Sequence, residues 1–168
     1  SVLLPKDYVR LLMTGEKASD ASDAAGTLWV DVEHRRWSPE MLAATGLNES
    51  HMPRLVEGTE VTGQLSAKVA QAWGMSQVPV AGGGGDNAAG AIGIGVIAPG
   101  DAFLSLGTSG VLFLVTPRFL SNPDRAVHAF CHCLPGLWHQ MSVMLSAASC
   151  APAARPGSLR PSRRGPTA

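Results

Sequence analysis

A run of four glycines, Gly82–Gly85, constrains the fold of this chain most, because it separates a short apolar segment from a stretch of small residues. Residues 78–81 are Val-Pro-Val-Ala, which predicts a strand. Asp86 follows the glycines, and alanine and glycine then recur at helical spacing through residue 93. Glycine tolerates positive φ and lets the backbone approach a ligand closely. The pattern therefore predicts a strand, a glycine turn and a helix that begins near a single carboxylate.

Asp86 has two interpretations on this pattern. A carboxylate at the start of a helix lies near the positive end of the helix dipole, which favours its ionised form. It can then accept a proton from an alcohol that attacks an electrophile, and Asn87 can hydrogen-bond a neighbouring hydroxyl. Aspartate is also a preferred N-cap, and on the pattern alone a plain helix cap is the favoured interpretation, although the two roles are compatible. The small residues of 88–93 likewise fit either tight packing or the close approach of a ligand, and these alternatives stay open.

A second glycine turn, Gly107-Thr-Ser-Gly110, joins apolar runs at 102–106 and 111–115, which predicts a β-hairpin. The backbone N–H groups of such a turn can bind an anion, and the hydroxyls of Thr108 and Ser109 can add donors. An ordinary hairpin turn satisfies the same pattern. The sequence contains neither G-x-x-x-x-G-K-S/T nor a full G-x-G-x-x-G, so no P-loop and no dinucleotide-binding fingerprint is predicted.

The remaining elements are predicted from start and stop signals. Helices that begin at proline or serine and end before glycine are expected at residues 4–14, 38–45 and 66–73. In the first of them, Leu4, Tyr8, Leu11 and Leu12 share an apolar face. A loop with a short helix is expected over 16–31, a turn-rich segment over 52–63, strands over 127–133 and 137–142, and a helix over 142–150. Helices with one strand thus precede consecutive strands, which places a domain boundary near 97–101.

Composition narrows the class of protein. The 13 basic and 13 acidic side chains give a net charge of +0, so no basic excess favours a nucleic-acid partner. No apolar run approaches the roughly 18 residues of a membrane span, and no signal-peptide pattern is present. Three cysteines are too few for a disulfide scaffold, which favours the cytoplasm. His128, Cys131, His132 and Cys133 fit no zinc spacing well, so a buried strand with free thiols is preferred to a metal site.

The two ends of the sequence predict a fragment. Ser1 is not an initiating methionine, and the chain starts inside apolar sequence. Residues 151–168 are rich in proline, arginine, glycine, serine and alanine, which predicts a disordered tail. A basic nucleic-acid arm is the less favoured interpretation of that segment.

The ordered set of motifs resembles the FGGY family of carbohydrate kinases, and within it the branch that phosphorylates D-xylulose. The resemblance covers about residues 1–150 and is more specific than any single motif. Its segments, in chain order, are Pro5–Tyr8, Met13–Glu16, Ser19–Thr27, Ala81–Ala91, Leu104–Gly110, His128–His132 and Trp138–Ser149.

This resemblance implies an actin-like (ribonuclease H-like) α/β ATPase fold with two domains and an active site in the cleft between them. Residues 1–98 would be the C-terminal part of the first domain. Residues 99–150 would supply the first strands and the start of a helix of the second domain, and 151–168 would be an unmatched tail. For the full-length protein that contains this sequence, the expected assembly is a homodimer.

The same resemblance implies the chemistry and its residues. The γ-phosphoryl of ATP, with Mg²⁺, would pass to the terminal hydroxyl of D-xylulose. Asp86 would be the proton acceptor, Asn87 would lie beside the sugar, and Gly107, Thr108, Ser109 and Gly110 would contact the phosphates of ATP.

Parts of the family pattern have no counterpart in this sequence. These are the first phosphate loop with its Asp-Gly-Thr, part of the sugar pocket and the adenine-holding segments, so this chain alone is expected to be inactive or poorly folded. Two alternatives follow: a non-catalytic remnant that acts at most as a structural or binding module, and a kinase for glycerol, gluconate or ribulose.

Overall fold

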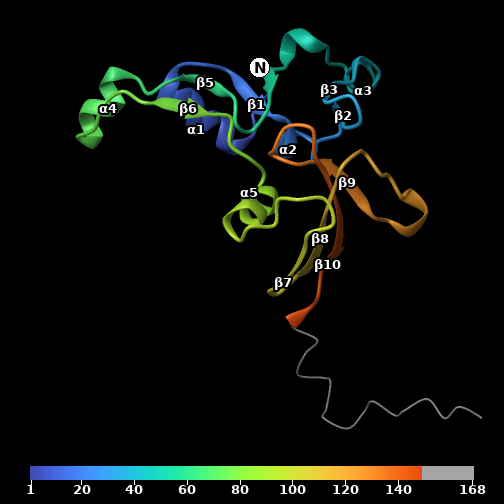
Figure 1. Cartoon of the computed structure of the whole chain (residues 1–168). Helices are drawn as coiled ribbons and strands as arrows, with labels where there is room; N and C mark the ends of the chain where they lie inside the picture. The colour runs from blue at the N-terminus through green and yellow to red at the C-terminus, as the bar shows by residue number, and fades with distance from the viewer. Residues whose placement is uncertain (149–168) are drawn as a thin grey trace, which may run out of the picture.

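The computed structural model describes residues 1–148 and places them in two connected parts (Figure 1). Short helices and two-stranded sheets of residues 1–81 gather at one end of the molecule. A four-stranded sheet from residues 102–144 lies at the other end, and α5 (Asp86–Gly93) lies beside it. The predicted tail, 151–168, lies outside the described residues.

The predicted helices form at their start signals, which are Pro5 for the first helix and the capping serines Ser38 and Ser66 for the other two. The helices are α1 (Pro5–Thr14), α2 (Ala21–Ala24), α3 (Pro39–Ala44), α4 (Ala67–Trp73) and α5, with single 3₁₀ turns η1 (Glu49–His51) and η2 (Pro123–Arg125). The Ser38 hydroxyl accepts the N–H of Met41 at 3.3 Å, and the Ser66 hydroxyl accepts that of Val69 at 3.4 Å. The predictions at 4–14, 38–45 and 66–73 are therefore confirmed. No helix within residues 1–148 is long and apolar enough to cross a bilayer.

The buried face of α1 differs from the apolar face seen in the sequence. Asp7 and Arg10 are its buried residues, whereas Tyr8 and Leu12 are exposed. The reason is that Arg10 finds buried acceptors: its guanidinium donates to the Gly82 carbonyl at 3.0 Å and pairs with Asp7 at 2.9 Å. Buried charges are tolerated only when they are paired and hydrogen-bonded, and such partners are invisible in a helical pattern.

Three two-stranded sheets complete the first part of the chain. β1 (Ala18–Asp20) pairs in parallel with β4 (Arg54–Val56). β2 (Val30–Asp31) pairs with β3 (Arg36–Trp37), and β5 (Val61–Gln64) pairs with β6 (Pro79–Ala81), both antiparallel. The strand predicted at 78–81 is confirmed. The turn-rich segment 52–63 instead holds β4 and the start of β5, because these short strands are stabilised by pairing with distant segments.

The larger sheet is antiparallel throughout, in the order β7-β8-β10-β9. Its strands are β7 (Ala102–Leu106), β8 (Gly110–Thr116), β9 (His128–Cys131) and β10 (Trp138–Met144). The strands predicted over these segments are confirmed. The helix predicted from Ser142 is wrong at its start, because Ser142 pairs with Leu112 and β10 continues to Met144. The end of that prediction, at 149–150, lies outside the described part of the chain.

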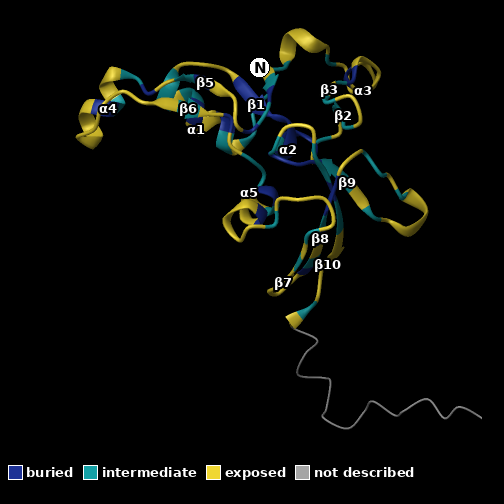
Figure 2. Ribbon diagram, viewed as in Figure 1, coloured by how far each residue is buried: buried dark blue, intermediate teal, exposed yellow. Residues whose placement is uncertain are grey.

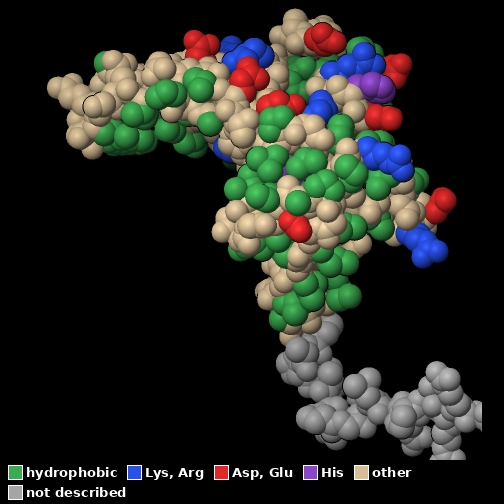
Figure 3. All heavy atoms as spheres, viewed as in Figure 1, with side chains coloured by type: hydrophobic (Ala, Val, Ile, Leu, Met, Phe, Trp, Pro, Cys, Tyr) green, Lys and Arg blue, Asp and Glu red, His purple; other side chains and the backbone are tan. Residues whose placement is uncertain are grey.

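The two faces of this sheet are used differently. Phe103 and Phe113 are paired neighbours whose rings stack at 4.9 Å, and together with Ala91 of α5 they belong to one apolar cluster. Leu104 and Leu112 are paired on the opposite face and are exposed. Figure 3 shows hydrophobic side chains gathered at this end of the molecule. One face of α5, with Ala88 and Ala91, is buried, and Ala91 packs on the sheet. Gly90 and Gly93 have open space around them, so the tight-packing interpretation of the small residues holds for that one face only.

A second apolar cluster joins the two parts of the chain. Ala21 and Ala25, in and just after α2, pack with Cys131 of β9, and four half-buried side chains surround them: Val32, Leu55, Phe130 and Trp138. The indole N–H of Trp138 donates to the Val32 carbonyl at 2.8 Å. Figure 2 shows the buried residues concentrated along this joint between α2, β1 and β9.

Arg35 reinforces the joint. Its guanidinium makes a two-pronged pair with Glu57, at 2.8 and 2.6 Å, and donates to the carbonyls of Leu137 at 2.8 Å and His132 at 3.1 Å. It also lies 5.1 Å from the ring centre of Trp138. Arg35 has a φ of +53°, a conformation unusual for a non-glycine residue, and these contacts stabilise it there.

Candidate active site

The glycine run packs against backbone on both sides. A Cβ on Gly82 would lie 2.6 Å from the Glu57 carbonyl oxygen, and one on Gly84 would lie 2.9 Å from the Cβ of Cys133. Gly83 has a φ of +87°, in the left-handed region. The close approach predicted for these glycines is thus made by neighbouring chain segments, which bring the end of β6, the loop after β9 and the start of α5 together.

Asp86 is the first residue of α5, and the cap position belongs to Gly85, which has no side chain. The helix-cap interpretation of Asp86 is therefore wrong. Its carboxylate is exposed, and one oxygen accepts the Asn87 backbone N–H at 2.7 Å and the Asn87 side-chain amide at 3.1 Å. The carboxylate is held in one orientation at a helix N-terminus, where the dipole favours negative charge.

Asp86 lines a pocket of about 140 Å³, and residues from both parts of the chain contribute to this lining. The pocket residues come from α2 and its surroundings, from the start of α5 and from strands β9 and β10: Ser22, Asp23, Gly26, Gly85, Asp86, Asn87, Ala88, Phe130, His139 and Met141. Two carboxylates, an amide and an imidazole beside apolar side chains suit a ligand that carries several hydroxyl groups.

Asp23 is the second carboxylate of the pocket. Burial raises its pKa, the positive charge of Lys6 lowers it, and the charges of Asp20, Asp7 and Asp86 raise it further. The Lys6 ammonium lies 3.7 Å from Asp23. Burial also lowers the pKa of Lys6, but its hydrogen bonds to Asp20 and Asp7 outweigh burial and leave that pKa raised. A cation therefore lies beside the Asp23 carboxylate of the pocket.

His139 closes the pocket from β10. It is buried, and its ring stacks on Phe113 with centroids 4.2 Å apart. Burial lowers its pKa to about 3, and the neighbouring His132 acts in the same direction. At neutral pH the pocket is thus lined by an uncharged imidazole.

The turn Gly107–Gly110 forms the predicted hairpin between β7 and β8. The side chains of Thr108 and Ser109 are exposed, and the Gly107 N–H is engaged with the Ser109 carbonyl at 2.9 Å. Among the described residues, the Asp86 pocket takes none of its lining from this turn. Figure 1 shows the turn at the end of the sheet remote from α2. Asp86 and Asn87 are therefore neighbours, and the hairpin turn is apart from them.

Comparison with known proteins decides the family. A family model described as "FGGY family of carbohydrate kinases, N-terminal domain" matches residues 1–93. The chain belongs to the FGGY family of carbohydrate kinases. Two curated relatives are named xylulose kinase: this FGGY chain is 66% identical over 149 residues to that of Klebsiella pneumoniae and 64% identical over 149 residues to that of Escherichia coli K12. Each alignment covers 89% of this chain and 31% of the relative's length.

Solved structures agree with this membership. A xyloylose kinase from Brucella ovis is 58% identical with a TM-score of 0.88, over 91% of this FGGY chain and 32% of that protein. A xylulose kinase from Rhodospirillum rubrum is 26% identical with a TM-score of 0.79, over 88% and 30%. The glycerol kinase of Plasmodium falciparum, at 17% identity and a TM-score of 0.70 over 88% and 30%, shares the fold. This FGGY chain therefore has the actin-like α/β fold predicted for it, over about a third of the length of these relatives.

The histidines and thiols near β9 do not form a metal centre in the part of the chain that the structure describes. Residues 1–148 contain no group of three or more histidine, cysteine, aspartate or glutamate side chains that could hold a metal ion. Cys131 and Cys133 are buried free thiols, and burial raises the pKa of each to about 11.

Three polar side chains that line the pocket of this FGGY chain were missed as individual residues in the sequence: Ser22, Asp23 and His139. Each lies in a segment that resembles the family, Ser19–Thr27 or Trp138–Ser149. The signal in the sequence was the pair of carboxylates, Asp20 and Asp23, among small residues. Only the fold shows that this segment and β10 lie beside Asp86.

Proposed function

We propose that this chain is part of a xylulokinase, which transfers the γ-phosphoryl of ATP to the terminal hydroxyl of D-xylulose and forms D-xylulose 5-phosphate. The observation that carries the proposal is the exposed carboxylate of Asp86, fixed by Asn87 in a pocket that combines polar groups with apolar side chains. The high identity to two proteins named xylulose kinase supports the choice of sugar.

Asp86 acts as the general base. Its carboxylate accepts the proton of the attacking hydroxyl, while Asn87, which donates to the same carboxylate, keeps the acceptor oxygen in place. The Asn87 amide also reaches the pocket and can hydrogen-bond a second sugar hydroxyl. The protein's contribution to phosphoryl transfer is mainly of this kind, positioning and charge stabilisation.

Gly107, Thr108, Ser109 and Gly110 contact the phosphates of ATP in this proposal. Since their turn lies outside the Asp86 pocket, the reaction requires a closed arrangement in which the two glycine turns approach and exclude water. Mg²⁺ would arrive bound to ATP. The described residues contain no cluster of side chains that could hold a metal ion. No separate role in the proton transfer is therefore assigned to Mg²⁺.

The whole enzyme is longer than this chain in our proposal. Residues 1–98 are the C-terminal part of its first domain and 99–150 the start of its second, and segments elsewhere complete the sugar pocket and the adenine site. We further propose a homodimer in the cytoplasm. The two buried free thiols are in keeping with a reducing compartment.

The test uses the full-length protein that carries this sequence, with ATP, Mg²⁺ and D-xylulose. Asp86→Asn should lower kcat by roughly 10²-fold or more, because the amide cannot accept the proton. Asp124→Asn, at an exposed carboxylate of η2, is the control and should leave turnover unchanged. Near-normal turnover of the Asp86→Asn enzyme would refute the general-base role. Parallel assays with glycerol, gluconate and ribulose decide the sugar by kcat/KM.

A non-catalytic binding module is the second candidate for the 168-residue chain itself. The separation of the hairpin turn from the pocket favours it, because only part of an ATP site is assembled. Calorimetric titration of this chain with D-xylulose and with ATP separates the candidates: binding of the sugar without turnover supports a module.

A further inference from the structure

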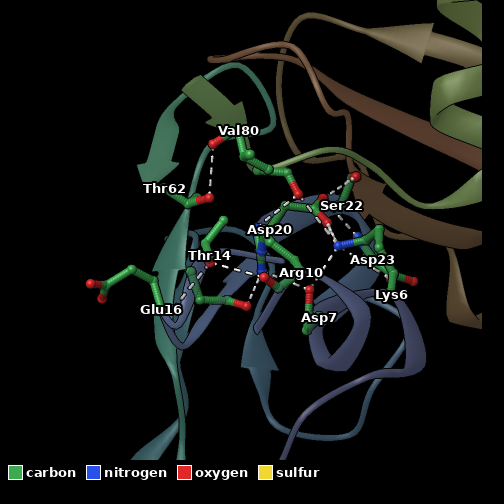
Figure 4. Close-up of polar contacts among 12 residues, drawn as sticks. Lys6, Asp7, Arg10, Thr14, Glu16, Asp20, Ser22, Asp23, Thr62 and Val80 are labelled. Carbon is green, nitrogen blue, oxygen red and sulfur yellow. Dashed lines mark hydrogen bonds and ion pairs between the residues drawn. The ribbon is translucent and has the colours of Figure 1, made fainter. Parts of the chain in front are cut away.

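A buried group of charges lies beneath the glycine run, and the reaction above gives it no role. The Lys6 ammonium is 2.7 Å from Asp20 and 2.8 Å from Asp7, and Arg10 pairs with Asp7 at 2.9 Å and donates to the Gly82 carbonyl at 3.0 Å (Figure 4). Both carboxylates are fully buried. Burying charges costs free energy unless they are paired with good geometry, so such a group must be well organised to persist.

Asp20 uses its two oxygens differently. One faces Lys6, and the other accepts the backbone N–H groups of Ser22 at 3.0 Å and Asp23 at 3.1 Å, together with the Ser22 hydroxyl. The hydroxyl hydrogen of Ser22 is thus committed to Asp20, and its oxygen remains free to accept. Figure 4 shows Asp20 and Ser22 side by side within this group.

The Ser22 oxygen accepts the backbone N–H of Gly85 at 3.0 Å, across 63 residues of sequence. Gly85 is the N-cap of α5, and Asp86 follows it. Gly85 has no side chain to anchor it, and this hydrogen bond links the start of α5 to α2. A Cβ on Gly85 would also lie 3.4 Å from the Cα of Asp23, so the two segments are in contact.

We propose that Ser22, oriented by Asp20, is a positioning residue for Asp86. The charges of Lys6 and Asp20 hold the Ser22 hydroxyl, the hydroxyl holds Gly85, and Gly85 sets where the Asp86 carboxylate stands in the pocket. The catalytic consequence rests on the proposed function, whereas the hydrogen bond to Gly85 does not. A misplacement of about 1 Å at a reacting group can cost about 10²-fold in rate, so one lost hydrogen bond at this point has a large effect.

The activity test compares three variants of the full-length protein. Ser22→Ala and Ser22→Cys should lower kcat by about 10- to 100-fold and leave KM for D-xylulose within about 3-fold, because the carboxylate is present but displaced. Ser22→Thr keeps the hydroxyl and should recover most of kcat. The matched control is Ser50→Ala, which removes another serine hydroxyl that donates to a cap side chain, Asn48 at 2.6 Å, at an exposed site. If Ser22→Ala does not fold, the nearly isosteric Ser22→Cys carries the test.

A second measurement does not depend on activity. Amide hydrogen exchange at Gly85 should accelerate by about 10-fold in Ser22→Ala and Ser22→Cys and stay unchanged in Ser50→Ala. The positioning role is overturned if both Ser22 variants keep kcat within about 2-fold, if Ser22→Thr fails to restore a loss of kcat, or if Gly85 exchange is unchanged. The two proposals can also fail separately. If Gly85 exchange accelerates in the Ser22 variants as expected but the wild-type protein does not phosphorylate D-xylulose, the proposed function is refuted and the Ser22–Gly85 link stands.

Discussion

Acidification should destabilise this chain in part through His139, and burial lowers the pKa of the neighbouring His132 in the same direction. The His139 imidazole is buried, and its pKa is about 3 in the folded protein against 6.5 as its ordinary value. The unfolded chain therefore binds a proton that the folded chain rejects. The stabilising contribution is fully present above pH 6.5 and is lost as the pH falls toward 3. Between pH 7 and pH 5 this single group should cost about 2 kcal/mol of the free energy of unfolding.

Urea denaturation of the 168-residue chain at pH 7 and at pH 5 measures that loss. Other groups titrate over the same range, and Asp23, whose raised pKa favours the folded state on acidification, acts in the opposite direction. The wild type is therefore compared with His139→Gln, which lacks the titrating ring and should lose about 2 kcal/mol less between the two pH values. His128→Gln, at an exposed histidine of β9, should retain the wild-type dependence.

Nuclear magnetic resonance titration of the ring gives the direct check. The His139 resonances should not shift between pH 8 and pH 5, while those of a solvated imidazole do. A His139 pKa close to 6.5, or an equal loss of stability in His139→Gln and wild type, would show that the ring is hydrated and would refute the assignment of a neutral imidazole to the pocket.

Two further predictions concern packing and the joint, and both are read from urea midpoints. Gly84→Ala should destabilise the chain by about 1–3 kcal/mol, because its Cβ would meet Cys133 at 2.9 Å. Gly90→Ala has open space around it and should stabilise α5 by about 1 kcal/mol, so equal effects at the two glycines would contradict the packing described. Arg35→Ala should cost about 2–3 kcal/mol through its lost partners on both sides of the joint. Arg36→Ala, at an exposed side chain, should stay within about 0.5 kcal/mol, and a similar loss at both arginines would count against a special role for Arg35.

Local signals predicted the elements whose stability is local. Ser38 and Ser66 cap helices through their own side chains, and Gly74 ends α4 in the left-handed conformation, so these helices could be predicted from neighbouring residues alone. The parallel pair of β1 with β4 could not, because three-residue strands carry no usable alternation and exist through a partner 36 positions away, as in the pairing of Ala18 with Arg54. The helix expected from Ser142 failed for the same reason: pairing with β8 overrides the small residues that follow.

The residues of the candidate site can be separated in the same way, into those indicated by the local sequence and those that only the fold brings together. Asp86 and Asn87 could be selected from the sequence because the carboxylate directly follows four glycines. A helix cap explained that pattern as well, and the resemblance to the family is what favoured the catalytic role. Ser22 and His139 could not, because their positions beside Asp86 depend on α2 and β10 meeting at the start of α5. The structure also shows that the glycines themselves are explained largely by contact with Glu57 and Cys133.

The joint between the two parts also has a consequence for the order in which the chain folds. The contacts of Arg35 with His132 and Leu137, and of Val32 with Trp138, span 97, 102 and 106 residues. During synthesis, α2 emerges from the ribosome with one side of its apolar cluster open, and it stays open until β9 and β10 have been made. Contacts of such sequence separation slow folding, since a long loop must close before any of them forms. Until then the early segments expose apolar surface, which makes this interval the stage at which chaperones would matter most.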